Sequence, residues 1–437
     1  MSYTQLKDAR VDKKIEQELK VICEGILEVV EPISIILFGG FGKGEGYAQV
    51  KGDQVILSKD YDILLVVKKK LSPSKMYEVS GNIHKRLGRA NPLDSVTMEQ
   101  YSGASWVQLS QFTINDLLYF RDVKIYEIKE ASKLLWGEDV RKKIPLSLED
   151  LSPWNGIRFL LRKPPGLCSC FSTKYLEKPP EGQEKRTLIY ECTRFYVDVG
   201  VLLTILARNY RPTYHERAEV IKKSLTSSLP RVAEEIPDLA EKIAHFTDLK
   251  LSPDDEKYDA INDPVKLWFN TRRDLGIILR YFMEHHLREK AKGWAELFEK
   301  YNVRVNRDFV DELGYFYLKK RFKIANKMLA RLANIAYQRL FCLKYVLKLY
   351  EKERVLLLSA LSEFPTFKVG TSGLMLLFSL NEDGTLDRGL FSSFVKGLKQ
   401  IYPLTIKGTT DEEKWAEAVG QYVRADRTFL DTFYGWG

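Results

Sequence analysis

The first third of the chain alternates short apolar runs with helical patterns. Ile33–Phe38 is apolar, rich in β-branched residues and too short for a helix, which predicts a buried strand. Asp60–Val67 predicts a second buried strand that opens on two carboxylates. Apolar residues recur at helical spacing in residues 4–30 and 74–87, so we expect a helix in each. The glycine-rich segment Gly39–Gly46 follows the first strand directly and predicts a turn that leads into a helix.

The pattern continues as a mixed domain up to a polar stretch near residue 150. Residues 93–99 predict a short strand in the same sheet. We therefore expect residues 1–150 to form a domain with a mixed sheet flanked by helices.

Helical spacing dominates the rest of the chain. Residues 151–365 predict a mainly helical domain, interrupted at 163–184 by a loop rich in Pro, Gly, Cys and Ser. In the C-terminal segment, 366–437, the pattern contains strand-like and helical pieces and leaves their order open. The predicted fold class is α+β.

The start of the second strand carries candidate chemistry. Residues i and i+2 of a strand point to the same face, so Asp60 and Asp62 project side by side while Tyr61 points away. Two neighbouring carboxylates repel each other unless a cation lies between them, and Mg²⁺ binds through carboxylates together with substrate phosphates. Glycines allow the backbone to approach a phosphate closely, and Gly39 and Gly40 open a helix whose N–H groups attract anions.

Lys43 and Glu45 lie within the same glycine-rich segment. The lysine can add a point charge to a bound phosphate. We expect the glutamate to be structural and to pair with its own turn. A carboxylate pair beside a glycine-lined anion site is the arrangement that phosphoryl or nucleotidyl transfer needs.

The sequence Phe38-Gly-Gly-Phe-Gly-Lys-Gly-Glu45, followed by Lys59-Asp-Tyr-Asp-Ile63, resembles the signature of the DNA polymerase β nucleotidyltransferase superfamily. That superfamily includes kanamycin nucleotidyltransferase and CCA-adding enzymes. Residues 123–137, which end in Trp136-Gly137, resemble the end of many such domains, and this resemblance implies a small helix followed by a strand. The spacer between Gly40 and Asp60 is longer than usual. It predicts an inserted hairpin of residues 48–51 and 54–57 with its turn at Gly52-Asp53.

The resemblance implies a metal-dependent nucleotidyltransferase that uses a nucleoside triphosphate and Mg²⁺ or Mn²⁺. Asp60 and Asp62 would bind the metal, and Gly39, Gly40 and Lys43 the nucleotide. In the superfamily the next strand carries a third metal-binding carboxylate. Asp94 is the matching position and is also a candidate for accepting a proton from the acceptor hydroxyl. Glu99 is the alternative, because a one-residue slip in strand register changes the face.

Composition sets limits on partners and location. The 437 residues carry a net charge of +9, spread along the chain in short clusters, which suits an enzyme that handles nucleotide phosphates and also an RNA partner. No apolar run approaches the length of a membrane span, and the polar first residues predict no signal peptide. The five cysteines are odd in number and unevenly placed, so we expect a reducing, cytoplasmic location.

Three hypotheses follow from these patterns. The first is an enzyme that transfers a nucleoside monophosphate to a small molecule or a protein. The second is an RNA-directed nucleotidyltransferase, which predicts a basic cleft continuous with the active site. The third is a non-catalytic, antitoxin-like interaction protein that keeps the fold without binding metal.

Overall fold

The computed structural model describes residues 2–57, 60–91, 106–309 and 365–434, together with Met328, Leu329, Leu332, Ala336, Leu340 and Leu343. The described residues form two compact units. The first comprises residues 1–152 and 208–217, and the second comprises residues 153–207 and 218–436. Among the described residues, no helix combines the length and the apolar character that crossing a membrane requires.

The described residues of the first unit form a four-stranded mixed sheet with the order β5-β4-β1-β6. Strand β1 pairs antiparallel with β4 and with β6, whereas β4 pairs parallel with β5. A separate two-stranded sheet is formed by β2 and β3. The strands are β1 (Ser34–Phe38), β2 (Ala48–Lys51), β3 (Gln54–Leu57), β4 (Tyr61–Val67), β5 (Val107–Thr113) and β6 (Lys133–Gly137).

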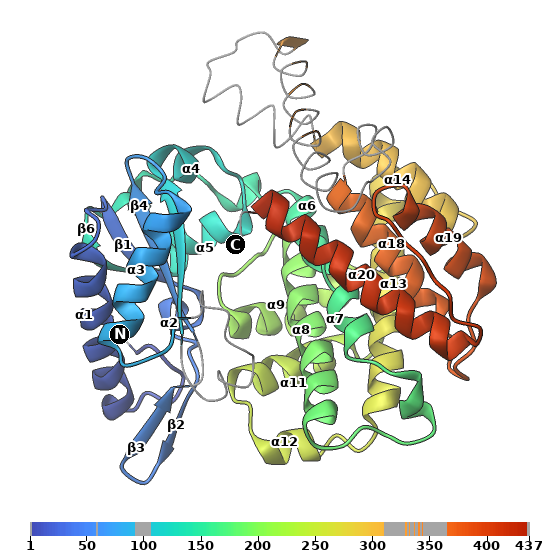
Figure 1. Ribbon diagram of the computed structural model, residues 1–437, viewed down its shortest axis with the longest axis horizontal. Coiled ribbons are helices and arrows are strands. Elements are labelled where there is room, and N and C mark those ends of the chain that lie inside the picture. The colour runs from blue at the N-terminus through green and yellow to red at the C-terminus, as the bar shows by residue number, and fades with distance from the viewer. Residues whose placement is uncertain are drawn as a thin grey trace. The chain divides into compact units, whose positions relative to one another are not determined.

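The described α-helices that lie wholly in this unit are α1 (Ala9–Leu27), α2 (Gly39–Lys43), α3 (Pro73–Arg86), α4 (Ile114–Tyr119) and α5 (Val123–Ala131). Helices α1 and α3 pack against each other and lie together on one face of the sheet (Figure 1). Their apolar residues form one core with alternate residues of β1 and β4, including Ile35, Leu37, Ile63 and Leu65. Because strand residues alternate between faces, Asp62 lies on the face opposite to this core.

The local predictions for this unit agree with the structure at several points. The inserted hairpin is present with its turn at Gly52, whose φ is +60°. The helix expected at residues 74–87 is α3, and Ser72 caps it by accepting a hydrogen bond from the Lys75 N–H at 3.2 Å. A small helix, a strand and Trp136-Gly137 follow one another at residues 123–137. Residues 93–99, for which we expected a short strand, lie outside the described residues.

The second unit is helical. Its described α-helices are α6 (Pro153–Leu161), α7 (Pro164–Ser169), α8 (Gly182–Leu206), α9 (Tyr214–Ser228), α10 (Pro230–Glu235), α11 (Leu239–Leu251), α12 (Asp255–Asp259), α13 (Pro264–Leu287), α14 (Trp294–Phe309), α18 (Pro365–Ser379), α19 (Arg388–Lys399) and α20 (Asp411–Tyr434). The N-terminal residues of α9 belong to the first unit. A small mixed sheet followed by a helical region confirms the coarse form of the α+β prediction.

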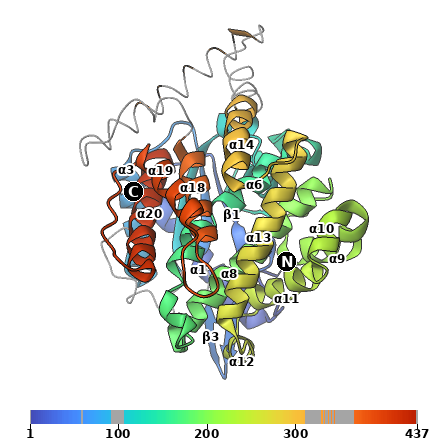
Figure 2. The ribbon, with the colours of Figure 1, turned by 90° about the vertical axis from the view of Figure 1, so that its right-hand side faces the viewer.

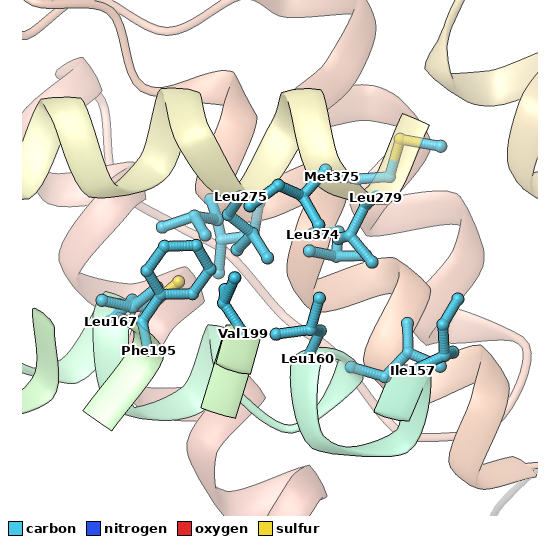
Figure 3. Close-up of a cluster of buried hydrophobic side chains, with 14 of the residues drawn as sticks. Ile157, Leu160, Leu167, Phe195, Val199, Leu275, Leu279, Leu374 and Met375 are labelled. Carbon is cyan, nitrogen blue, oxygen red and sulfur yellow. The ribbon is translucent and has the colours of Figure 1, made fainter. Parts of the chain in front are cut away.

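The core of the second unit forms around α8 and α13, which pack against each other (Figure 2). Leu167, Phe195, Leu275 and Leu374 come from four different helices and meet in this core (Figure 3). Within residues 163–184, where the composition predicted a loop, α7 and a 3₁₀ turn at Thr173–Leu176 form. The described part of the C-terminal segment is mainly helical, and its one extended pairing is the bridge between Leu380 and Leu386.

Candidate active site

The site begins where β1 ends and α2 starts. Phe38 is still extended, whereas Gly39 has a φ of +63°, a left-handed conformation that favours glycine. Helix α2 then runs for little more than one turn and ends at Gly44, whose φ is +78°. The Glu45 N–H donates to the Gly40 carbonyl at 2.8 Å and closes the turn. The predicted glycine turn and helix start are thus both present.

Asp62 lies directly against this turn. In the antiparallel register Phe38 is opposite Asp62, so the end of β1 brings Gly39 to the carboxylate. A Cβ added to Gly39 would lie 1.8 Å from Oδ2 and 2.9 Å from Cβ of Asp62, well inside van der Waals contact. The position therefore requires glycine for two reasons, its φ and the space that the carboxylate occupies.

Asp60 lies just before β4, two residues ahead of Asp62. Tyr61, between them, points to the other face, where its ring stacks on Phe41 with the centroids 5.0 Å apart. The Trp106 N–H donates to Asp60 Oδ1 at 3.4 Å. Tyr61 therefore points away from Asp62 at the start of β4, as the alternation along a strand predicted.

The two carboxylates are electrostatically coupled. Burial and then the charge of Asp60 raise the pKa of Asp62 to about 6, against the opposing effect of Lys124 and Lys43. The pKa of Asp60 is also raised, because the surrounding protein removes water from its carboxylate, although the Trp106 N–H partly offsets the effect. Ionisation of Asp62 is therefore unfavourable in the free protein, and a cation bound beside the carboxylate would stabilise its charged form.

The third carboxylate of the predicted site does not come from β5. This strand lies parallel to β4, and Gln108 is in register with Asp62. Its sequence, Val-Gln-Leu-Ser-Gln-Phe-Thr, contains no acidic residue. Both Asp94 and Glu99 lie outside the described residues, and the part of the chain that is described contains no group of three or more His, Cys, Asp or Glu arranged to hold a metal.

Lys43, which we expected to bind phosphate, is held by an internal ion pair. Its side chain is 4% exposed, and its ammonium lies 2.7 Å from Glu127 Oε1 on α5. The ammonium also lies 5.1 Å from the centre of the Tyr214 ring. The structure thus brings Gly39, Asp60 and Asp62 together and directs the charged end of Lys43 towards Glu127.

Glu127 is the centre of a buried network. Its Oε1 accepts hydrogen bonds from the Tyr210 hydroxyl at 2.6 Å and from Arg217 Nη1 at 3.2 Å. Arg217 also donates to the carbonyls of Arg211 and Pro212. Burial by itself raises the pKa of Glu127, but the charges of Lys43 and Arg217 outweigh it and lower the pKa below the ordinary value. The carboxylate is therefore ionised and shared by two cations.

Glu45 has a structural partner, but not the one that we expected. Its two carboxylate oxygens accept hydrogen bonds from the N–H groups of Tyr214 and His215, each at 2.9 Å, at the start of α9. A carboxylate there satisfies N–H groups that have no partner inside the helix. Lys43 and Glu45 thus connect residues 208–217 to the rest of the first unit.

Sequence reasoning missed two of the charged residues around Asp62. Lys124 and Glu127 lie on α5, and no local motif marks them. They can be identified only from the folded structure, in which α5 packs against β1. No family model matches the chain, and no curated protein is significantly similar to it in sequence. What the site can do is therefore inferred from its own geometry.

The contact between Gly39 and Asp62 predicts a difference between two glycine substitutions. Gly39→Ala and Gly52→Ala both place a side chain at positive φ, a strain of about 1 kcal/mol, but a Cβ at Gly52 meets nothing within 4 Å. We expect Gly52→Ala to lower the melting temperature slightly and Gly39→Ala to cost at least about 2 kcal/mol more. Calorimetry on both variants tests this, and equal losses would contradict the contact.

The raised pKa of Asp62 predicts a pH-dependent effect of Asp62→Asn. The unfolded carboxyl ionises near pH 4 and the folded one near pH 6, so the wild type loses stability as the pH rises through this window. Without divalent cations, we expect the variant to be more stable by about 2 kcal/mol at pH 7.5 and nearly equal at pH 4. Added Mn²⁺ should raise the melting temperature of the wild type only. Calorimetry of both proteins at both pH values tests this. A lower stability of Asp62→Asn than of the wild type at pH 7.5 would contradict the prediction.

Proposed function

We propose that the first unit is a nucleotidyltransferase domain of the DNA polymerase β type, which moves a nucleoside monophosphate from a nucleoside triphosphate to a hydroxyl acceptor on a small molecule or a protein. The observation that carries the proposal is the contact of the Asp62 carboxylate with Gly39, because it joins the acidic strand to the glycine turn. The antiparallel pairing of β1 and β4 fixes this arrangement.

The chemistry of the two carboxylates fits a divalent cation. Asp60 and Asp62 offer oxygen ligands, and their mutual repulsion is relieved by positive charge between them. Mg²⁺ or Mn²⁺ would be held by these two residues and by a third carboxylate, for which Asp94 and Glu99 both stay candidates. The metal would supply positive charge for the oxygens that gain charge in the transition state.

The residues of the turn would act on the phosphates. Gly39 and Gly40 are the first two residues of α2, and their backbone N–H groups lie where β1 ends. Asp62 contacts Gly39 at this point. Gly39 and Gly40 carry no side chains of their own that would keep a triphosphate away from the backbone. Lys43 contributes positive charge from within its ion pair with Glu127, and a direct contact with phosphate would require that this pair opens.

The reaction then proceeds by in-line displacement. The acceptor hydroxyl oxygen forms a bond to the α-phosphorus, the bond between that phosphorus and the bridging α,β oxygen breaks, and pyrophosphate leaves with the electron pair. The hydroxyl proton passes to a carboxylate beside the acceptor, for which Asp94 is our candidate. Asp60 and Asp62 would hold the divalent cation, and through it the triphosphate, in a fixed orientation towards the acceptor hydroxyl.

Incubation with each labelled nucleoside triphosphate and Mg²⁺ or Mn²⁺ tests the function. Pyrophosphate release is followed, together with label on the protein, on added RNA and on small molecules. We expect release with at least one nucleotide, and a loss of 10²-fold or more in Asp62→Asn, because the variant loses a charge-stabilising ligand. Asp53→Asn in the exposed hairpin turn is the matched control and should keep full activity.

The alternatives are separated by the same experiment. Label on RNA alone would identify an RNA-directed enzyme. No release with any nucleotide, in a protein that also fails to bind Mn²⁺, would favour a non-catalytic interaction protein. Undiminished release in Asp62→Asn would contradict the assignment of Asp62.

A further inference from the structure

Lys124 places a cation beside the carboxylate pair. The residue lies in the first turn of α5, where its N–H donates to the capping Asp122 side chain at 2.7 Å. Its ammonium lies 4.6 Å from the centre of the Phe38 ring and 3.4 Å from Ser110 Oγ on β5. Phe38 is in register with Asp62 and Ser110 with Leu64, so the ammonium lies on the face of the sheet that carries Asp62.

The charges of Lys124 and Asp62 act on each other. After burial, which lowers the pKa of Lys124, the charge of Asp62 is the strongest influence on that pKa and raises it. Lys124 in turn opposes the rise in the pKa of Asp62. Lys43, the other cation that acts on Asp62, is already paired with Glu127 at 2.7 Å. The two lysines therefore differ: Lys43 is held in an ion pair with Glu127, whereas the Lys124 ammonium donates a hydrogen bond to the uncharged Ser110 hydroxyl.

We propose that Lys124 has two successive partners: it neutralises Asp62 while the site holds no metal, and it binds the triphosphate of the nucleotide once a divalent cation has taken over Asp62. This inference rests on the proposed function and names the phosphate ligand of the same site. A lysine suits both roles, because its ammonium is a compact charge with three donors on a flexible stem. The ammonium lies over the faces of the Phe38 and Phe112 rings, 4.6 Å and 5.7 Å from their centres, where the rings attract its charge.

The two roles predict effects of opposite sign. In the free protein the Lys124 ammonium repels an incoming cation, so its removal should tighten metal binding. In the loaded protein the same ammonium attracts phosphate, so its removal should weaken triphosphate binding. A residue that only supports the fold would change both affinities in the same direction.

Calorimetric titration of the full chain with two probes, Mn²⁺ alone and inorganic tripolyphosphate in saturating Mn²⁺, tests the proposal. Lys124→Met keeps the apolar stem over the rings and removes the charge. We expect it to bind Mn²⁺ about threefold or more tightly and tripolyphosphate about tenfold more weakly. Lys124→Arg should bind tripolyphosphate within a few-fold of the wild type. Lys142→Met removes a charge from an exposed side chain and should change neither affinity.

The outcomes separate this proposal from the function on which it rests. If the wild type binds Mn²⁺ through Asp62, but Lys124→Met weakens both affinities or changes neither, only the role of Lys124 is overturned. If the wild type binds neither Mn²⁺ nor tripolyphosphate, the proposed function fails and the role of Lys124 fails with it. Tighter Mn²⁺ binding together with weaker tripolyphosphate binding supports both.

Discussion

The contact between the Asp62 carboxylate and the Gly39 backbone is the constraint on which the rest of the first unit depends. Gly39 must turn at positive φ, and it must lack a side chain, because Asp62 fills the space where a Cβ would lie. The antiparallel pairing of β1 and β4 forces these residues together. The Asp62 carboxylate thereby lies against the backbone turn and near the charge of Asp60. Their repulsion is unfavourable, and a bound cation would relieve it.

The remaining residues of the glycine-rich segment stabilise the turn from behind. Lys43 contacts Glu127, and Glu45 accepts hydrogen bonds from the start of α9, so the turn is fastened to residues that are distant in sequence. Arg217, which is 2% exposed, shares Glu127 with Lys43. Breaking such a buried ion pair by removing one partner typically costs 3–5 kcal/mol, because the other charge is left uncompensated. In the glycine-rich segment, Gly39 thus contacts the Asp62 carboxylate, whereas Lys43 and Glu45 anchor the segment to the rest of the first unit.

The sequence predicted those features whose causes are local. The strands β1 and β4 follow from apolar runs, the hairpin turn at Gly52 from its turn residues, and α3 from the helical spacing of its apolar residues. The same-face placement of Asp60 and Asp62 follows from the period of a strand.

Features that depend on packing between distant segments could not be read in this way. Nothing near Lys43 in the sequence points to Glu127 on α5, and nothing near Glu45 points to Tyr214. Helix α7 forms within a stretch whose Pro, Gly and Cys content indicates a loop, because Leu167 and Cys168 are buried in the core of the second unit. Tertiary burial there overrides local propensity.

The most direct test of the central claim is a crystal structure of the protein with Mn²⁺ and a non-hydrolysable nucleoside triphosphate, with the metal located by its anomalous scattering. We predict an anomalous peak within coordination distance of both Asp60 and Asp62, with the triphosphate against the backbone of Gly39 and Gly40. Bound nucleotide elsewhere on the chain, with no metal at these two carboxylates, would contradict the account.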